Sequence, residues 1–282
     1  MNKKILYIAG GVTIFASVLI AVFFVGSPPE RDVKWGVNFS VKHATEIGLD
    51  WKEAYIALLD EVGVRDVKIA AHWDQLEEQQ NQFTFGDLDW QFKEAAKRNA
   101  TVSLVVGMKT PRWPECHLPV WFGELEREAQ ERELLEYIEA VVARYKDNPQ
   151  LVYWQVENEP FFGFGNCPWR DKTVLQKEVE LVRSLDAEHS VVVTDTGEFS
   201  FWNRAAKYGD IVGVTLYRKV FSDPLGIYIN YPLTPMTYWR KAQIIQSLFG
   251  KETIGIELQT EPWGPERWKY ISLEEQAKTM TP

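Results

Sequence analysis

The sequence has little that would let it hold a metal ion or a polyanion. Four histidines and two cysteines occur among 282 residues, and they do not stand at the short spacing typical of a zinc site. The formal net charge is −9 at pH 7, and lysine and arginine form no run outside the first few residues. We therefore expect no metal, no other cofactor and no nucleic-acid partner.

The chain also lacks low-complexity tracts and internal sequence repeats. Hydrophobic residues make up 45% of it, which is enough for one large core. Barrels of alternating strands and helices commonly occupy this length as a single domain. One globular domain is therefore expected over residues 34–282, and the sequence does not indicate an oligomeric state.

One long apolar run stands at the N-terminus. Two lysines precede an uncharged segment, residues 5–25, that has about the length of a membrane-spanning helix. No A-x-A cleavage site occurs in the following residues 26–29, which favours an uncleaved signal anchor (1–26) and a linker (27–33) over a removed signal peptide. Because the lysines should stay in the cytoplasm, the domain is expected at the cell surface or in the periplasm. Secretion is the alternative.

After the linker, apolar runs of strand length alternate with longer amphipathic segments. Seven strands are expected, over residues 34–39, 66–71, 101–106, 151–156, 191–195, 211–216 and 253–258. Helices are expected over residues 51–62, 90–98, 131–145, 173–185, 203–208 and 237–248. This alternation is typical of repeated βα units around a parallel sheet. We therefore predict an α/β fold, a (β/α)8 TIM barrel with its helices outside.

An eighth strand is missing from this pattern. The segment "RWKYISL" at 267–273 follows the seventh strand too closely for a helical crossover to come before a parallel strand. The last residues resemble the start of an outer helix. We expect a barrel truncated before its eighth strand, because proteins normally avoid the open edge that would remain. A complete seven-stranded fold is the alternative.

Acidic residues follow two of the predicted strands. The segment "WQVENEP" places Glu157, Asn158 and Glu159 after the fourth strand, and "IGIELQTEP" places Glu257 at the end of the seventh strand, with Glu261 in the loop beyond. The C-terminal ends of the strands carry the chemistry in such barrels. A glutamate in apolar or acidic surroundings can keep a proton near neutral pH and donate it to a leaving group.

The segment "ENEP" resembles the acid/base motif of the clan of retaining (β/α)8-barrel β-glycosidases, which includes family 5 cellulases and family 42 β-galactosidases. The resemblance implies that Glu159 is the acid/base and that Asn158 holds the sugar 2-hydroxyl. It also implies that Glu257 is the nucleophile, since the Glu-Leu-Gln that begins there is similar to the Glu-x-Gln pattern of the family 42 type. Glu157 is then a supporting group or a solvated loop charge, and Glu261 contacts substrate or solvent.

The resemblance implies a glycoside hydrolase that cleaves β-glycosidic bonds of an oligo- or polysaccharide. Two carboxyl groups about 5–5.5 Å apart permit double displacement with retention, whereas a gap of about 6.5–9.5 Å leaves room for water and inversion. The clan implies retention. The alternative from another class is a non-catalytic carbohydrate-binding or scaffold protein on a glycosidase-like barrel.

Other strand ends carry residues suited to a sugar site, because flat aromatic side chains can lie against a pyranose face while neighbouring groups bond its hydroxyls. The candidates are His72, Trp73, Trp113, His117, Trp121, Trp169, Trp202 and Trp263. Tyr217 follows the sixth strand, where the clan commonly has a tyrosine that bonds the nucleophile; a buried tyrosine is the alternative. Lys68 stands in the second strand, where family 5 usually has an arginine whose bidentate role lysine cannot inherit.

Cys116 and Cys167 fall in the loops after the third and fourth strands, which are neighbours around a barrel. A disulfide between them suits an exported protein with two cysteines, and two free thiols are the alternative. Such a bond would brace the rim beside Glu159.

Overall fold

The computed structural model describes residues 12, 17, 21–222, 225–259, 272 and 274. Most of the predicted anchor lies outside these residues, and within them no helix is both long enough and apolar enough to cross a membrane. The anchor therefore stays a prediction. Glu261, Trp263 and nearly all of the segment after the seventh strand also lie outside the described residues.

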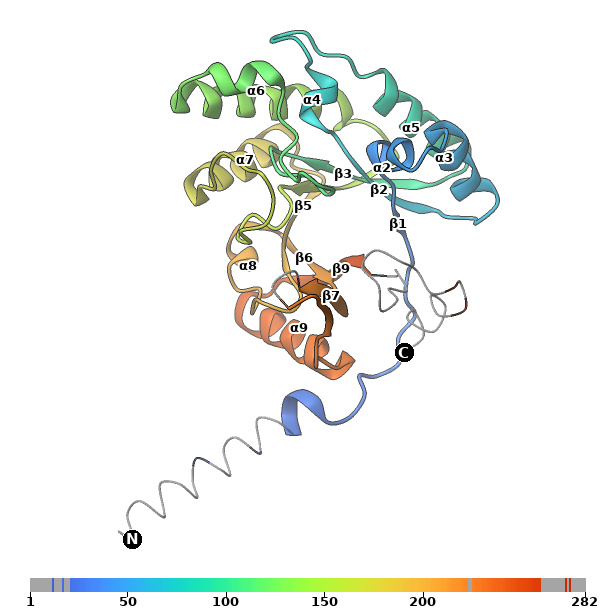
Figure 1. Ribbon diagram of the computed structural model, residues 1–282, viewed down its shortest axis with the longest axis vertical. Helices are drawn as coiled ribbons and strands as arrows, with labels where there is room; N and C mark the ends of the chain where they lie inside the picture. The colour runs from blue at the N-terminus through green and yellow to red at the C-terminus, as the bar shows by residue number, and fades with distance from the viewer. Residues whose placement is uncertain are drawn as a thin grey trace.

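Seven parallel strands form one sheet (Figure 1). In sheet order they are β1 (Val37–Asn38), β2 (Asp66–Ala70), β3 (Thr101–Val106), β4 (Leu151–Val156), β5 (Ser190–Thr196), β6 (Ile211–Leu216) and β9 (Glu252–Leu258). Each pairs in parallel with its neighbours. The predicted parallel sheet of seven strands is thereby confirmed.

The two edge strands of this sheet come close to each other. Asn38 in β1 donates a hydrogen bond from Nδ2 to the carbonyl oxygen of Ile256 in β9 at 3.2 Å. Lys68 in β2 reaches Glu257 in β9, with Nζ 2.8 Å from Oε1. Both contacts require the sheet to curl round on itself, so the described strands form a nearly closed barrel, in agreement with the predicted barrel fold.

Helices follow most strands and lie outside the barrel (Figure 1). They are α2 (Val41–Glu46), α3 (Trp51–Asp60), α4 (Trp73–Leu76), α5 (Gly86–Lys97), the 3-10 helix η1 (Val120–Glu124), α6 (Arg127–Tyr145), α7 (Lys172–Leu185), α8 (Ala205–Tyr208) and α9 (Pro235–Phe249). The predicted helices correspond to α3 and α5 to α9. Asp50 caps α3 by accepting from the Lys52 and Glu53 amides, and such a cap fixes where a helix begins.

A short hairpin, β7 (Lys219–Ser222) and β8 (Ile227–Asn230), lies between β6 and α9 and was not predicted. Its strands have only four residues each, which is too short for a clear alternation of apolar and polar residues. Gly226 has a φ of 64° at the turn, a backbone conformation that glycine adopts without strain. The hairpin extends the rim where the C-terminal ends of the strands lie.

Candidate active site

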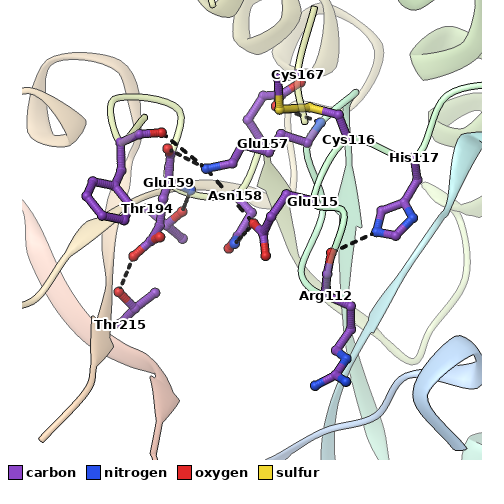
Figure 2. Close-up of polar contacts among 12 residues, drawn as sticks. Arg112, Glu115, Cys116, His117, Glu157, Asn158, Glu159, Cys167, Thr194 and Thr215 are labelled. Atoms are coloured by element: carbon purple, nitrogen blue, oxygen red, sulfur yellow. Dashed lines mark hydrogen bonds and ion pairs between the residues drawn. A yellow bond between two sulfur atoms is a disulfide. The ribbon is translucent and has the colours of Figure 1, made fainter. Parts of the chain in front are cut away.

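Glu159 lies in a tight turn just after β4. Glu157 and Glu159 have φ angles of 59° and 45°, a left-handed conformation that non-glycine residues seldom adopt. The turn is held because the Glu159 N–H donates to Oγ1 of Thr194 in β5 at 2.7 Å. The Glu159 carboxyl accepts a hydrogen bond from the hydroxyl of Thr215 in β6. Figure 2 shows Glu159 held between these two threonines.

The surroundings of Glu159 favour its protonated form. The residue is buried, with 9% of its surface exposed. Burial raises the pKa of Glu159 to about 7, the negative charges of Glu257 and Asp195 act in the same direction, and the Thr215 hydrogen bond and the Lys109 cation oppose them. Glu159 therefore carries a proton in a large fraction of molecules at neutral pH, as a general acid requires.

Glu257, at the end of β9, has a donor on each carboxylate oxygen. Lys68 donates from Nζ to Oε1 at 2.8 Å, and the Tyr217 hydroxyl donates to Oε2 at 3.0 Å. A cation and a hydroxyl fix the orientation of the carboxylate and stabilise its negative charge. The contact of Lys68 with one oxygen agrees with the expectation that lysine does not form a bidentate pair. Tyr217 is exposed, so the alternative of a buried tyrosine does not hold.

Glu157 is buried and braces the site from behind. Its two carboxylate oxygens accept hydrogen bonds from the backbone N–H groups of Met108 at 2.7 Å and Lys109 at 2.9 Å. Burial raises the pKa of both Glu157 and Glu178 of α7, and the hydrogen bond between the two carboxyls needs a proton on one of them. Glu157 thus ties the end of β3 to that of β4, and the alternative of a solvated loop charge is wrong.

Asn158 is held by protein groups on both sides of its amide. Its Oδ1 accepts from Nε2 of Gln155 at 3.1 Å, and its Nδ2 donates to Oε2 of Glu115 at 3.3 Å. Figure 2 shows the Asn158 and Glu115 side chains facing each other. These contacts fix the orientation of the amide, and its contact with a sugar hydroxyl stays a prediction.

Glu115 and Lys109 belong to the site and were missed in the sequence. Burial raises the pKa of Glu115 to about 7, and the charges of Glu257 and Glu159 act in the same direction, against Lys109 and Asn158. The buried Lys109 lies 3.9 Å from Glu115 and donates to the carbonyl oxygen of Glu159 at 3.1 Å. Both residues occur in "MKTPRWPECHLP" after β3, so their position after a strand was an available signal.

His72 and His117 support the loop after β3 and are both buried. Their rings meet edge to face at 4.3 Å. His117 accepts at Nδ1 from the Lys42 ammonium at 2.8 Å, and its Nε2 lies 3.1 Å from the carbonyl oxygen of Arg112. Burial and the Lys42 charge lower the pKa of His117 to about 4, so the neutral ring can accept from lysine. His72 is only 4% exposed, and its contact with substrate stays a prediction.

Two tryptophans predicted to contact substrate belong to the core instead. Trp73 is fully buried and donates from Nε1 to Oε2 of Glu77 at 2.6 Å, and Trp202 is 1% exposed and donates to the Thr196 carbonyl. Trp121 packs edge-on against Trp73 at 5.8 Å and donates to the carbonyl oxygen of Glu77. Each indole N–H has an internal partner, which is how buried tryptophans are satisfied.

The other two described tryptophan candidates, Trp169 and Trp113, differ in how far they are exposed to solvent. Trp169 lies under the Arg127 guanidinium, 3.7 Å from the ring centroid, and donates to Gln130 of α6 at 2.8 Å. Trp113 is 58% exposed in the loop after β3. Trp113 alone among the five described tryptophan candidates presents most of its ring to solvent.

Cys116 and Cys167 are joined by a disulfide, with Cα atoms 5.2 Å apart. The bond connects the loop after β3 to the loop after β4, directly beside Glu115 (Figure 2). Gly165 has a φ of 98°, and a Cβ there would lie 2.5 Å from Cβ of Glu115. The two loops are therefore in close contact where the disulfide holds them.

Replacing both cysteines with serine should lower the free energy of unfolding by about 2–4 kcal/mol, because the bond closes a long loop in the unfolded chain. The two cysteines are separated by 51 residues. Thermal denaturation should show a lower Tm, by roughly 2–4 °C for each kcal/mol lost. Reducing the wild-type protein should produce the same shift, and an unchanged Tm in both samples would contradict the stabilising role.

Sequence comparisons relate this chain to glycoside hydrolases. A family model described as glycosyl hydrolase family 10 matches residues 50–178. The probable mannan endo-1,4-beta-mannosidase A of Aspergillus oryzae is 32% identical over 79 residues, which are 27% of this chain and 19% of that protein. The beta-galactosidase BgaA of Clostridium cellulovorans is 25% identical over 175 residues, 52% of this chain and 25% of that protein. The chain thus spans a quarter or less of the length of these relatives.

Solved structures extend the likeness to most of the chain. A family 10 endo-beta-1,4-xylanase from Gloeophyllum trabeum superposes with a TM-score of 0.58 at 17% identity, covering 86% of this chain and 76% of that one. GH5_18 from Streptomyces cattleya gives a TM-score of 0.52 at 15% identity, covering 67% and 52%. At such identities the likeness shows the fold. The predicted resemblance is confirmed: in sequence over residues 50–178 and in fold over most of its length, the chain is similar to the glycoside hydrolases of the (β/α)8-barrel clan.

Proposed function

We propose that the protein hydrolyses β-glycosidic bonds of an oligo- or polysaccharide by double displacement. The observation that carries this proposal is the contrast between two glutamates at one rim. Glu159 is buried with its pKa raised to about 7, and the Glu257 carboxylate accepts hydrogen bonds from Lys68 and Tyr217. A buried carboxyl that keeps a proton, beside a carboxylate oriented by a cation and a hydroxyl, suits a proton donor and a nucleophile.

The first step forms a glycosyl-enzyme. A Glu257 oxygen attacks the anomeric carbon, and the bond from that carbon to the glycosidic oxygen breaks. Glu159 gives its proton to this oxygen, so the leaving sugar departs with a hydroxyl group. In the second step the Glu159 carboxylate takes a proton from water, the water oxygen attacks the anomeric carbon, and Glu257 is released. Two displacements at one carbon give retention.

Charge at Glu257 couples the two steps. The Glu257 carboxylate is one of the groups that raise the pKa of Glu159. Once Glu257 has become an ester, its negative charge is gone, and the pKa of Glu159 should fall. The same residue is then suited to act as a base in the second step, after acting as an acid in the first.

Activity should decline as pH rises through about 7, because the acid form of Glu159 is lost above its pKa. The Thr215 hydroxyl donates to the Glu159 carboxyl and lowers that pKa. Thr215→Val should therefore raise it and move the alkaline limb of kcat/KM to higher pH. Thr110→Val is the matched control, since Oγ1 of Thr110 is buried and has no hydrogen-bond partner among the described residues. If the alkaline limb of the kcat/KM profile of Thr215→Val stays at the same pH or moves to lower pH, the role of Glu159 is contradicted.

The proposed reaction is tested by incubating the protein with β-mannan, xylan, cellulose and β-galactoside substrates and measuring released reducing ends. Release from at least one of them, with the product first formed as the β-anomer, is expected. Binding without any release would favour the non-catalytic alternative. We also propose that the barrel works outside the cytoplasm, which the disulfide between Cys116 and Cys167 supports.

A further inference from the structure

A band of aromatic rings crosses the rim next to Glu159. We define this aromatic band as Trp113, Phe164, Phe162, Phe199 and Tyr231. Successive rings lie 5.7, 6.3, 5.9 and 5.2 Å apart between centroids. The rings come from the loops after β3, β4 and β5 and from the residue that follows β8, so several separate segments bring them into one row.

Much of the band faces solvent. Trp113, Phe164 and Phe199 are 58%, 48% and 63% exposed. Contiguous exposed apolar surface is uncommon on soluble proteins and marks an interaction site. Phe162 stacks on both Phe164 and Phe199, with ring planes that differ by 20° and 12°, so the middle of the row is one block of aromatic surface. Exposed aromatic surface of this kind can pack against the apolar faces of pyranose rings.

The band is attached to the backbone of the proton donor. The Phe162 N–H donates to the carbonyl oxygen of Glu159 at 3.0 Å, and the Lys109 ammonium donates to the carbonyl oxygens of both Glu159 and Phe162. In the proposed reaction Glu159 protonates the oxygen of the leaving sugar. Sugar units that lie along the band are therefore those on the leaving-group side, whereas the sugar that bonds to Glu257 lies on the other side of the cleaved bond.

We propose that the aromatic band binds consecutive sugar units of a β-linked polysaccharide on the leaving-group side of the cleaved bond. This inference rests on the proposed function. A polymer would then be preferred over a short glycoside, because only a polymer fills the band. Of the five described tryptophans expected to form such a surface, Trp113 alone lies in the band, and the other rings of the band are three phenylalanines and a tyrosine.

The double variant Phe164→Ala with Phe199→Ala tests this site. Both side chains are about half exposed or more, so their truncation should not affect folding. Affinity electrophoresis of the full chain in gels that contain galactomannan, xylan or a soluble cellulose derivative measures binding without any need for turnover. The wild type should be retarded by at least one polymer, and the double variant should bind it roughly 10- to 100-fold more weakly, as expected for two lost ring contacts.

Trp35→Ala is the matched control, because Trp35 is 60% exposed and precedes β1, at the opposite end of the strands. It should be retarded like the wild type. In parallel, kcat/KM should fall in the double variant for the polysaccharide but not for an aryl glycoside of one sugar. A polymer-specific loss of this kind is what a site beyond the cleaved bond predicts.

The two proposals can fail separately. Three results would overturn the assignment of the aromatic band as a sugar-binding site, even if aryl glycosides are hydrolysed. They are a wild type that no gel retards, a double variant that is retarded as much as the wild type, and a loss of retardation in Trp35→Ala equal to that in the double variant. If the wild type is retarded, the double variant is not, and no substrate is hydrolysed, the band remains a polysaccharide-binding site and the proposed reaction is overturned.

Discussion

Glu257→Gln should abolish hydrolysis of every substrate, whereas Glu159→Gln should spare the first step on substrates with good leaving groups. An amide at position 257 cannot form the glycosyl ester, so neither step can proceed. An amide at position 159 removes the proton donor, which contributes about 10²- to 10⁴-fold when the leaving group needs protonation. An activated aryl group leaves without that help, so the first step should remain fast on such substrates.

The two variants are compared by steady-state and burst kinetics on an activated aryl glycoside and on an unactivated oligosaccharide. In Glu159→Gln the aryl substrate should give a burst, because the second step has lost its base and the glycosyl-enzyme accumulates. Glu188→Gln is the control, since Glu188 is exposed and precedes β5 at the other end of the barrel. Equal losses on both substrates in Glu159→Gln would contradict its assignment as the acid/base.

Lys68→Met should damage both folding and catalysis. The Lys68 and Glu257 side chains are only 5% and 11% exposed, so the pair is largely withdrawn from water. Removing one partner of such a pair leaves an uncompensated charge and typically costs about 3–5 kcal/mol. The Glu257 carboxylate would also lose the cation that orients it for attack. We therefore expect a lower free energy of unfolding at neutral pH and a lower kcat on every substrate.

A double-mutant cycle separates the lost charge pair from lost packing. Urea denaturation of Lys68→Met, Glu257→Gln and the double variant should show that Glu257→Gln restores stability in the Lys68→Met background, because no charge remains to be paired. Lys68→Arg, which keeps the cation, should be far less damaging than Lys68→Met. Strictly additive losses in the cycle would show that the pair is not coupled.

The barrel could be predicted from the sequence because its strands are buried on both faces. Runs such as residues 101–106 and 151–156 are then almost wholly apolar and stand out between amphipathic helices. The positions of Glu159 and Glu257 after the fourth and seventh strands followed from that count. The hairpin and the one-turn helix α4 did not, because their few residues carry too little periodicity and depend on tertiary contacts.

Side-chain direction at the rim could not be predicted from position after a strand. Trp73 turns inward because Glu77, one helical turn later, accepts its indole N–H. The aromatic residues that do face solvent stand in "FFGFG" and "EFSFW", where Phe164 and Phe199 were as visible as any tryptophan. Glu115 likewise acquires its role only through the fold, which brings the loop after β3 against Asn158.

Intact-mass analysis after incubation with a panel of 2-fluoro β-glycosides tests the assignment of the two glutamates most directly. A fluorosugar slows both steps and traps the ester, so the wild type should gain the mass of one sugar. The adduct should map to Glu257 by peptide sequencing and be absent from Glu257→Gln. An adduct on another residue, or no adduct with a sugar that the protein does hydrolyse, would contradict double displacement through Glu257.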